Sequence, residues 1–299
     1  MLNIERVRAL CALADHGSIA AVADALGVTP SGVSQQLAKL EKEVGTALIE
    51  REGRGVRLTD AGRLLARRGH EIISLLARAE SEVAALHGDV VGALRLGAFV
   101  SASRAALPEA VTRLRAAHPH LAVTLAEGES ETLIPQVMRR AMDVAVVDSW
   151  STLPLHIPPD AVFTMLHRDI ADVALPADHP LAQRECIPLA ELDGLGWAAW
   201  NEGTDFHDWL VQTLRANGVD PRIDFKVAEF ATHLEFVDRG LAAALIPRLA
   251  QVATPPGVRI VRTTPILYRD VLALSRADND RPTVRAGVTA LRSVFADLA

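Results

Sequence analysis

The sequence predicts an α/β protein with an all-α N-terminal head, a long linker helix and a two-lobed α/β domain. Three observations support this fold class. Residues 1–58 alternate short amphipathic helices with glycine stops, residues 59–88 carry one uninterrupted helical pattern, and the chain from residue 92 alternates short apolar strands with helices. A chain of 299 residues has room for two or three domains, and 49% apolar with 23% charged residues is typical of a folded globular protein.

The charge is divided unevenly along the chain. The whole sequence has a net charge of −6, but residues 1–70 contain ten Lys and Arg against eight Asp and Glu, which is a net +2. The remainder carries 21 basic and 29 acidic residues, which is a net −8. Binding to phosphate depends on the local field rather than on the total charge. We therefore expect the head to be the electropositive part.

Several classes of protein are excluded by simple features. No apolar run approaches the roughly 20 residues that cross a bilayer, and the charged N-terminus is unlike a secretory signal, so we expect a cytoplasmic protein without a membrane partner. Two cysteines are too few for a disulfide scaffold or a thiolate metal site. Metal-ligand, nucleotide-binding and hydrolase motifs are absent from the sequence. We predict no metal, no cofactor and no enzymatic activity.

The head begins with two short helices. Apolar residues recur at three- and four-residue steps between Ile4 and Ala14, which predicts an amphipathic helix that Gly17 ends. Ser18 is suited to cap a second helix, whose predicted inward face is Ile19, Val22, Ala23 and Leu26. Gly27 supplies its stop, because glycine takes the left-handed conformation without steric cost.

A third helix has the properties of a DNA-reading element. Thr29 and Pro30 give it a capping hydroxyl followed by proline at the first helical position. Its predicted inward face is Val33, Leu37, Leu40 and Val44. The opposite face carries Ser31, Ser34, Gln35, Ala38, Lys39 and Lys42. Ser and Gln can bond base edges and Lys can bond phosphate, so two helices joined by a tight turn predict major-groove recognition.

A wing and a linker helix follow. Residues 47–51 and 56–58 read as two short strands with Arg54 at the tip, where it could contact the sugar-phosphate backbone or the minor groove. Residues 59–87 then predict a helix whose apolar stripe is too long for the head alone to bury. We expect a second subunit to cover that stripe, which also supplies two recognition helices for two half-sites.

Residues 17–62 carry a dense motif. It reads G-S-x-x-x-V-A-x-x-L-x-V-T-P-S-x-V-S-Q-Q-L-x-x-L-E-x-x-V-G-x-x-L-x-x-R and is followed by L-T-x-A-G. The motif resembles the winged helix-turn-helix of LysR-type transcriptional regulators. Two departures from the family pattern stand out: Ile49 replaces a usual phenylalanine, and Pro30-Ser31 stands where many members carry glutamine-proline. The second departure bears on which bases are read.

The resemblance implies a set of partners and contacts. The partners are double-stranded operator DNA with two half-sites, a small-molecule effector, further copies of the chain in a dimer or tetramer, and RNA polymerase. The residues expected to contact DNA are Ser18, Thr29, Pro30, Ser31, Ser34, Gln35, Lys39, Arg51, Arg54 and Arg57.

The C-terminal two-thirds predict two α/β lobes. Strand, helix, strand, helix and strand alternate over residues 94–147 with apolar strands, which predicts a parallel sheet covered on both faces. Further strands are predicted at 163–166, 172–175, 196–199, 223–227, 243–246 and 268–275, and helices at 205–216, 232–238 and 282–298. The first lobe then comprises residues 92–161 and 266–299, and the second comprises 162–265. The resemblance to LysR-type effector domains, which are periplasmic-binding-protein-like, extends over this region.

A cleft between the lobes is the expected ligand site. Ligands in such folds lie at the carboxyl ends of strands and at helix N-termini. This rule selects Ser101, Ala102, Ser103, Glu129, Ser130, Trp200, Asn201, Glu202, Phe230, Ala231, Thr232 and Pro247. Most LysR-type effectors are small metabolites, often acids, yet Glu127, Glu129 and Glu202 leave room for a cationic or amine-bearing ligand.

The main prediction is a homo-oligomeric LysR-type regulator. Ligand-driven closure of the lobes would change the angle between paired heads and so the bend or spacing of bound DNA. Two alternatives remain at this point. One is a solute-binding protein without a regulatory role, and the other is an enzyme built on the same two-lobed fold, as some biosynthetic deaminases are.

Overall fold

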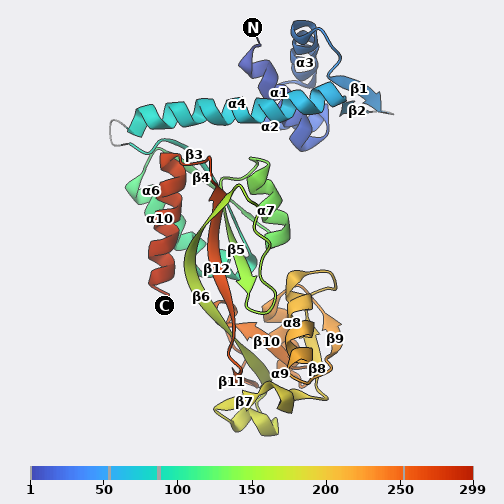
Figure 1. Cartoon of the computed structure of the whole chain (residues 1–299), viewed down its shortest axis with the longest axis vertical. Coiled ribbons are helices and arrows are strands. Elements are labelled where there is room, and N and C mark those ends of the chain that lie inside the picture. Colours follow the sequence, from blue (N-terminus) through green and yellow to red (C-terminus); the bar gives the residue numbers. More distant parts are fainter. Residues whose placement is uncertain (1, 53–54, 86–88, 252, 299) are drawn as a thin grey trace. The chain divides into compact units, whose positions relative to one another are not determined.

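The computed structural model describes residues 2–52, 55–85, 89–251 and 253–298. The chain divides into two compact units, residues 1–88 and residues 89–299 (Figure 1). Among the described residues, no helix combines the length and apolar character that crossing a bilayer requires.

The first unit is built from four helices and a two-stranded wing. Its elements are α1 (Ile4–His16), α2 (Ile19–Leu26), α3 (Pro30–Val44), β1 (Ile49–Glu52), β2 (Gly55–Leu58) and α4 (Asp60–Ala85). The predicted caps are confirmed. Ser18 Oγ accepts a hydrogen bond from the Ala21 amide at 3.2 Å, Thr29 Oγ1 accepts one from the Gly32 amide at 3.1 Å, and Gly27 ends α2 with φ of 65°.

The core of this unit fixes the position of α3. Leu10, Leu37, Leu40 and Leu48 are buried together between α1, α3 and the start of the wing. Glu41 Oε1 accepts hydrogen bonds from the amides of Leu48 and Ile49, at 2.8 and 3.1 Å, which ties α3 to the wing. Gly62 packs so closely on the wing entry that an added Cβ would lie 2.0 Å from the Leu48 carbonyl oxygen.

Two residues predicted to face inward are instead exposed. Leu26 is 42% exposed and Val44 is 37% exposed. Each is the last residue of its helix, α2 and α3 respectively, so its side chain projects beyond the elements that pack on the preceding turns.

The second unit is organised on a mixed sheet, and the parallel sheet predicted over residues 94–147 forms one part of it. Strands β3 (Gly92–Ala98), β4 (Leu121–Glu127) and β5 (Val144–Trp150) are parallel to one another. Strand β12 (Leu267–Arg276) pairs antiparallel with β5 because it returns from the other lobe, and β6 (Ala161–Pro176) pairs antiparallel with β12. The helices of this lobe are α5 (Val100–Ala105), α6 (Leu107–Ala117), α7 (Ser130–Met138) and α10 (Pro282–Ala296).

Strand β6 links the two lobes. Its first part pairs with β12, and its last residues pair with β10 (Ala244–Pro247) and β11 (Val258–Thr264). The sequence predicts two separate strands here, at 163–166 and 172–175, with His167, Arg168 and Asp169 in the interval between them. In the structure Arg168 and Asp169 pair with charged side chains on β12, so the strand runs through without a break.

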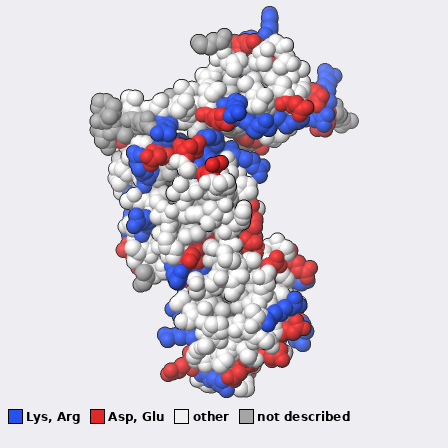
Figure 2. Space-filling model, in the orientation of Figure 1, with Lys and Arg blue, Asp and Glu red and all other residues white. Residues whose placement is uncertain are grey.

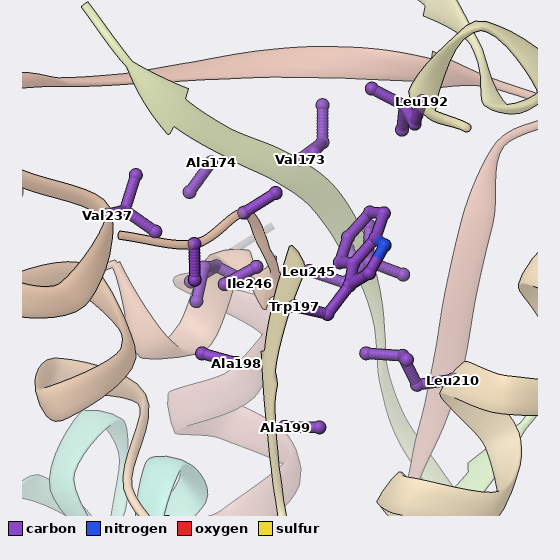
Figure 3. Close-up of a cluster of buried hydrophobic side chains, with 14 of the residues drawn as sticks. Val173, Ala174, Leu192, Trp197, Ala198, Ala199, Leu210, Val237, Leu245 and Ile246 are labelled. Atoms are coloured by element: carbon purple, nitrogen blue, oxygen red, sulfur yellow. The ribbon is translucent and has the colours of Figure 1, made fainter. Parts of the chain in front are cut away.

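The second lobe is completed by shorter elements. These are β7 (Cys186–Pro188), β8 (Gly196–Ala199), β9 (Arg222–Lys226), α8 (Asp205–Ala216), α9 (Phe230–Asp238) and 3₁₀ turns at Pro180–Gln183, Leu189–Leu192 and Arg248–Ala250. Figure 3 shows its core, in which Trp197 of β8 lies among Val173, Leu210 and Leu245. This packing fixes the carboxyl end of β8, from which Trp200 extends.

Candidate functional site

The outer face of α3 is open along its length. Ser31, Ser34, Gln35 and Lys39 are all exposed. Ser34 Oγ donates a hydrogen bond to the Pro30 carbonyl oxygen at 3.0 Å. Among the described residues, Gln35 and Lys39 form no side-chain hydrogen bond or ion pair within the chain, so both retain their full bonding capacity for an external partner.

The other residues predicted to contact DNA surround this face. Ser18 and Thr29 use their side chains as helix caps, and Pro30 is the first residue of α3. Arg57 Nε donates to Glu50 Oε1 across the wing at 2.6 Å, whereas Arg51 is exposed on β1. Arg54 lies outside the described residues. Figure 2 shows basic and acidic side chains interspersed over α4 and the wing.

A pocket lies between the two lobes of the second unit. It encloses about 290 Å³ of empty space when its mouth, which opens to solvent, is included. The lining residues are Phe99, Val100, Ser101, Glu129, Asp148 and Arg269 from the first lobe and Trp200, Phe206 and Phe230 from the second. Most of them stand at helix N-termini or strand ends, where the topology brings the two lobes together.

Four of the twelve residues predicted for the cleft line this pocket. They are Ser101, Glu129, Trp200 and Phe230. Ser130 lies directly behind the lining, because its Oγ donates a hydrogen bond to Asp148 Oδ1 at 2.7 Å.

The remaining predicted residues have other surroundings. Ala102 and Pro247 are buried, and Ser103 Oγ donates to the Ala98 carbonyl oxygen at 3.3 Å inside the first lobe. Asn201 and Ala231 are exposed, and exposed Glu202 forms an ion pair with Lys226. Thr232 Oγ1 donates to Glu229 Oε2 at 2.7 Å.

Sequence reasoning missed five residues of the lining. Phe99 and Val100 begin the unpredicted helix α5, and Phe206 lies on the first turn of α8. Asp148 lies in the carboxyl-terminal part of β5, so the same strand-end rule could have selected it. For Arg269 the available signal was the adjacent charged pair Arg269-Asp270 inside a strand that is mostly apolar.

Arg269 organises the floor of the pocket. The side chain is 3% exposed, and its Nη1 donates to Asp148 Oδ2 at 3.0 Å while its Nη2 donates to Ser101 Oγ at 2.8 Å. Nε and Nη2 also donate to Asp169 Oδ2, at 3.0 and 2.8 Å. The guanidinium lies 4.6 Å from the ring centre of Phe99. A buried charge is tolerated only when it is paired in this way.

Acidic groups dominate the edge of the pocket. Burial, together with the charges of Asp148 and Glu131, raises the pKa of Glu129 to about 7, and the Arg269 charge opposes that rise. Burial and the nearby Glu131 raise the pKa of Asp205 to about 6. The Asp205 amide on α8 donates to Glu131 Oε1 on α7 at 2.9 Å, which is a direct bond from one lobe to the other. Figure 2 shows acidic side chains at the narrow waist of this unit.

Comparison with known proteins identifies the family. The model of the bacterial regulatory helix-turn-helix protein of the lysR family matches residues 4–63, and the model of the LysR substrate binding domain matches residues 87–296. The chain belongs to the LysR family of transcriptional regulators. This membership bears out the resemblance seen in the motif over residues 17–62.

Individual proteins extend the match over nearly the whole chain. A small neutral protease regulatory protein of Streptomyces lividans is 34% identical over 284 residues, which cover 93% of this chain and 80% of that protein. The structure of a full-length OxyR variant from Pseudomonas aeruginosa has a TM-score of 0.76 at 21% identity and covers 98% of both chains. A full-length CbnR complexed with its target DNA has a TM-score of 0.63 at 21% identity and covers 98% of this chain and 100% of that one.

LysR-family membership decides between the function classes. The chain is a DNA-binding transcriptional regulator with an effector-binding domain, and the family consists of regulators rather than enzymes. This favours the main prediction over the solute-binding protein and over the enzyme. Among the described residues, no cluster of His, Cys, Asp and Glu could hold a metal ion.

Proposed function

We propose that this LysR-family chain is a cytoplasmic homo-oligomeric regulator in which three segments have different roles. Residues 1–58 bind operator DNA, residues 59–88 join two copies, and residues 92–299 bind the effector. Within the last part, residues 92–161 and 266–299 form the first lobe and residues 162–265 form the second. The observation that carries this proposal is the free outer face of α3, held by its caps and by a buried inner face.

In this proposal α3 reads the major groove. Gln35 is exposed and can make a bidentate contact with a base edge, while Lys39, one helical turn further along, can bond a phosphate. Ser31 and Ser34 flank Gln35 on the same exposed face. Arg51, Arg54 and Arg57 of the wing supply further phosphate contacts.

The linker helix supplies the contact between copies. Leu64, Ile72, Leu75 and Val83 on α4 are each more than 40% exposed, which leaves an apolar stripe open to solvent. Stripes of this kind mark interaction sites, and a second α4 is an equally apolar partner. Two paired heads then present two α3 helices to two half-sites.

The pocket between the lobes receives the effector. The bond from the Asp205 amide to Glu131 Oε1 joins α8 to α7 beside this pocket. A ligand that favours a different separation of the lobes would break or tighten that bond and so alter the angle between paired heads. A ligand shifts such an equilibrium only through its differential affinity for the two states.

The test is binding of the purified full-length protein to DNA from upstream of its own coding sequence. We expect sequence-selective binding that weakens steeply as salt concentration rises, because phosphate contacts release condensed counterions. A scrambled fragment of equal length and composition is the control. Equal affinity for the two fragments across the salt series would contradict the proposal.

A further inference from the structure

Three aromatic side chains form a continuous wall on the second-lobe side of the pocket. The ring centre of Trp200 lies 5.0 Å from that of Phe206 and 4.2 Å from that of Phe230, and the last two lie 5.2 Å apart. Phe99 faces them from the first lobe as a fourth aromatic lining residue. The ring planes are inclined to one another by 51°, 53° and 83°, so the wall presents a mixture of ring faces and edges. Such a lining suits the apolar body of a ligand.

Glu129 stands beside this wall with an unused carboxylate. It occupies the position before α7, yet its side chain makes no capping hydrogen bond. Among the described residues, its carboxylate forms no hydrogen bond or ion pair. A half-buried carboxylate without a partner is costly, and a cation in the pocket would remove that cost.

Arg269 is the one cation among the described lining residues, and it is already neutralised. Its three nitrogens donate to Asp148, Asp169 and Ser101. With Glu129 ionised, the lining residues Asp148, Glu129 and Arg269 carry a net charge of −1, and Asp169, buried behind them, adds one more negative charge. Glu131 and Asp205 add further negative charge at its edge. An anionic ligand would find no free cation among these residues and would face several carboxylates.

We propose that the pocket binds a small organic cation, an ammonium or guanidinium group on an apolar body, with Glu129 as its counter-ion and the Trp200–Phe206–Phe230 wall against that body. This inference rests on the proposed role of the pocket as the effector site. The chemical class of the ligand follows from the residues that line the pocket.

The pKa of Glu129 gives a second way to detect a cation bound in the pocket. Its pKa of about 7 reflects burial and the charges of Asp148 on β5, Glu131 on α7 and Asp205 on α8, opposed by Arg269 on β12. A bound cation stabilises the ionised carboxylate and lowers this pKa, so binding near pH 7 releases protons and strengthens as pH rises from 6 to 8. An anionic ligand would take up protons and bind more weakly over the same range.

The experiment is isothermal titration of the full-length protein with ligands of matched shape and different charge. The probes are benzylamine, phenethylamine and hexylamine, against phenylacetate, 3-phenylpropionate and heptanoate, with phenethyl alcohol as the neutral member. Titration in buffers of different ionisation enthalpy measures the protons released. We expect at least one amine to bind more tightly than its matched carboxylate and to release protons at pH 7.

Glu129→Gln is the decisive variant, since it removes the charge and keeps the shape. We expect it to weaken amine binding at least tenfold and to remove most of the proton release, leaving only the small share that Asp205 contributes. Glu127→Gln is the matched control, because Glu127 is an exposed carboxylate two residues away that does not line the pocket, and it should bind as the wild type does. Tighter binding of a carboxylate, no binding by any amine, or an unchanged Glu129→Gln affinity would each overturn the proposal. Calorimetric titration measures ligand binding in the absence of DNA. A protein that does not bind DNA would therefore contradict the proposed function but not the proposed class of ligand.

Discussion

Arg269 and Asp169 are direct cross-strand partners on β12 and β6, and the Arg269 guanidinium directs two nitrogens at one Asp169 oxygen. The other Asp169 oxygen accepts the Leu249 amide at 3.1 Å, in the 3₁₀ turn after β10. Asp169 is fully buried. The pair therefore joins the pocket floor to the strand that crosses between the lobes.

Replacing Asp169 should destabilise the second unit strongly. Asp169→Asn leaves the buried Arg269 guanidinium with one fewer counter-charge, and breaking a buried pair of this kind costs roughly 3 kcal/mol. All four tryptophans of the chain, at positions 150, 197, 200 and 209, belong to residues 89–299. Tryptophan fluorescence during urea unfolding of the full chain therefore reports on this unit alone.

The neighbouring pair in the same ladder is the control. Arg168 and Asp270 are also cross-strand partners, with Arg168 Nε 2.8 Å from Asp270 Oδ1, but the Arg168 side chain is 56% exposed. Exposed pairs contribute little to stability, so Asp270→Asn should leave the urea midpoint nearly unchanged. If Asp169→Asn and Asp270→Asn lower the free energy of unfolding by similar amounts, burial does not set the strength of the Arg269–Asp169 pair.

The Arg269–Asp169 and Arg168–Asp270 pairs also show which features the sequence alone does not predict. The helices of the head could be predicted, because Ser18, Thr29 and Gly27 act through the backbone next to them in the chain. Strand β6 was divided in two because the partners of Arg168 and Asp169 lie about 100 residues away on β12. No local pattern reports a charge that is neutralised by a distant strand.

The residues that line the pocket could likewise be predicted only in part. Ser101, Glu129, Trp200 and Phe230 lie directly at strand ends or helix starts, so topology could select them. Arg269 lies within a strand and reaches the pocket only through the pairing of β12 with β5 and β6. Glu202 satisfied the topological rule but forms an ion pair with Lys226 on β9 instead. Side-chain direction in a loop depends on such neighbours, which sequence spacing does not specify.

The stability of the unliganded second unit should fall as pH rises from about 4.5 to about 7. Burial raises the pKa of Glu129 from its ordinary value of 4.5 to about 7, so the folded state holds this proton more tightly than the unfolded state. The resulting stabilisation is complete below the unfolded pKa and is lost as pH rises through the folded pKa. The loss is at most about 3 kcal/mol from this group, at roughly 1.36 kcal/mol for each pKa unit.

Glu129→Gln should flatten that dependence and leave the variant more stable than the wild type at pH 8. Urea unfolding followed by tryptophan fluorescence at pH 5, 6, 7 and 8 measures it. Asp205, whose pKa is raised to about 6, contributes a loss of the same sign over a lower range that the variant retains. If the stability of the wild type and that of the variant depend on pH in the same way, the pKa of Glu129 is not raised in the folded state.

A polar substitution on the exposed stripe of α4 should separate the copies. Leu75 is 65% exposed within one chain, so Leu75→Gln costs the isolated unit little while it removes apolar area from a paired α4. We expect the mass from sedimentation equilibrium to fall at micromolar concentration. Arg67→Gln is the control, because Arg67 is exposed on a different side of α4. An oligomer that both variants leave intact would place the contact between copies elsewhere on the chain.

Two substitutions one turn apart on α3 should change DNA binding in different ways. Gln35→Ala removes a side chain suited to a base edge, so it should weaken binding to the cognate site by roughly 1–3 kcal/mol and relax the preference at one or two base positions. Lys39→Ala removes a phosphate contact, so it should weaken binding to cognate and scrambled DNA alike and make the salt dependence shallower by about one counterion. Fluorescence anisotropy with both DNAs over a salt series separates the two effects. A Gln35→Ala variant that weakens both DNAs equally, or a Lys39→Ala variant that alters base preference, would reverse the roles assigned to these side chains.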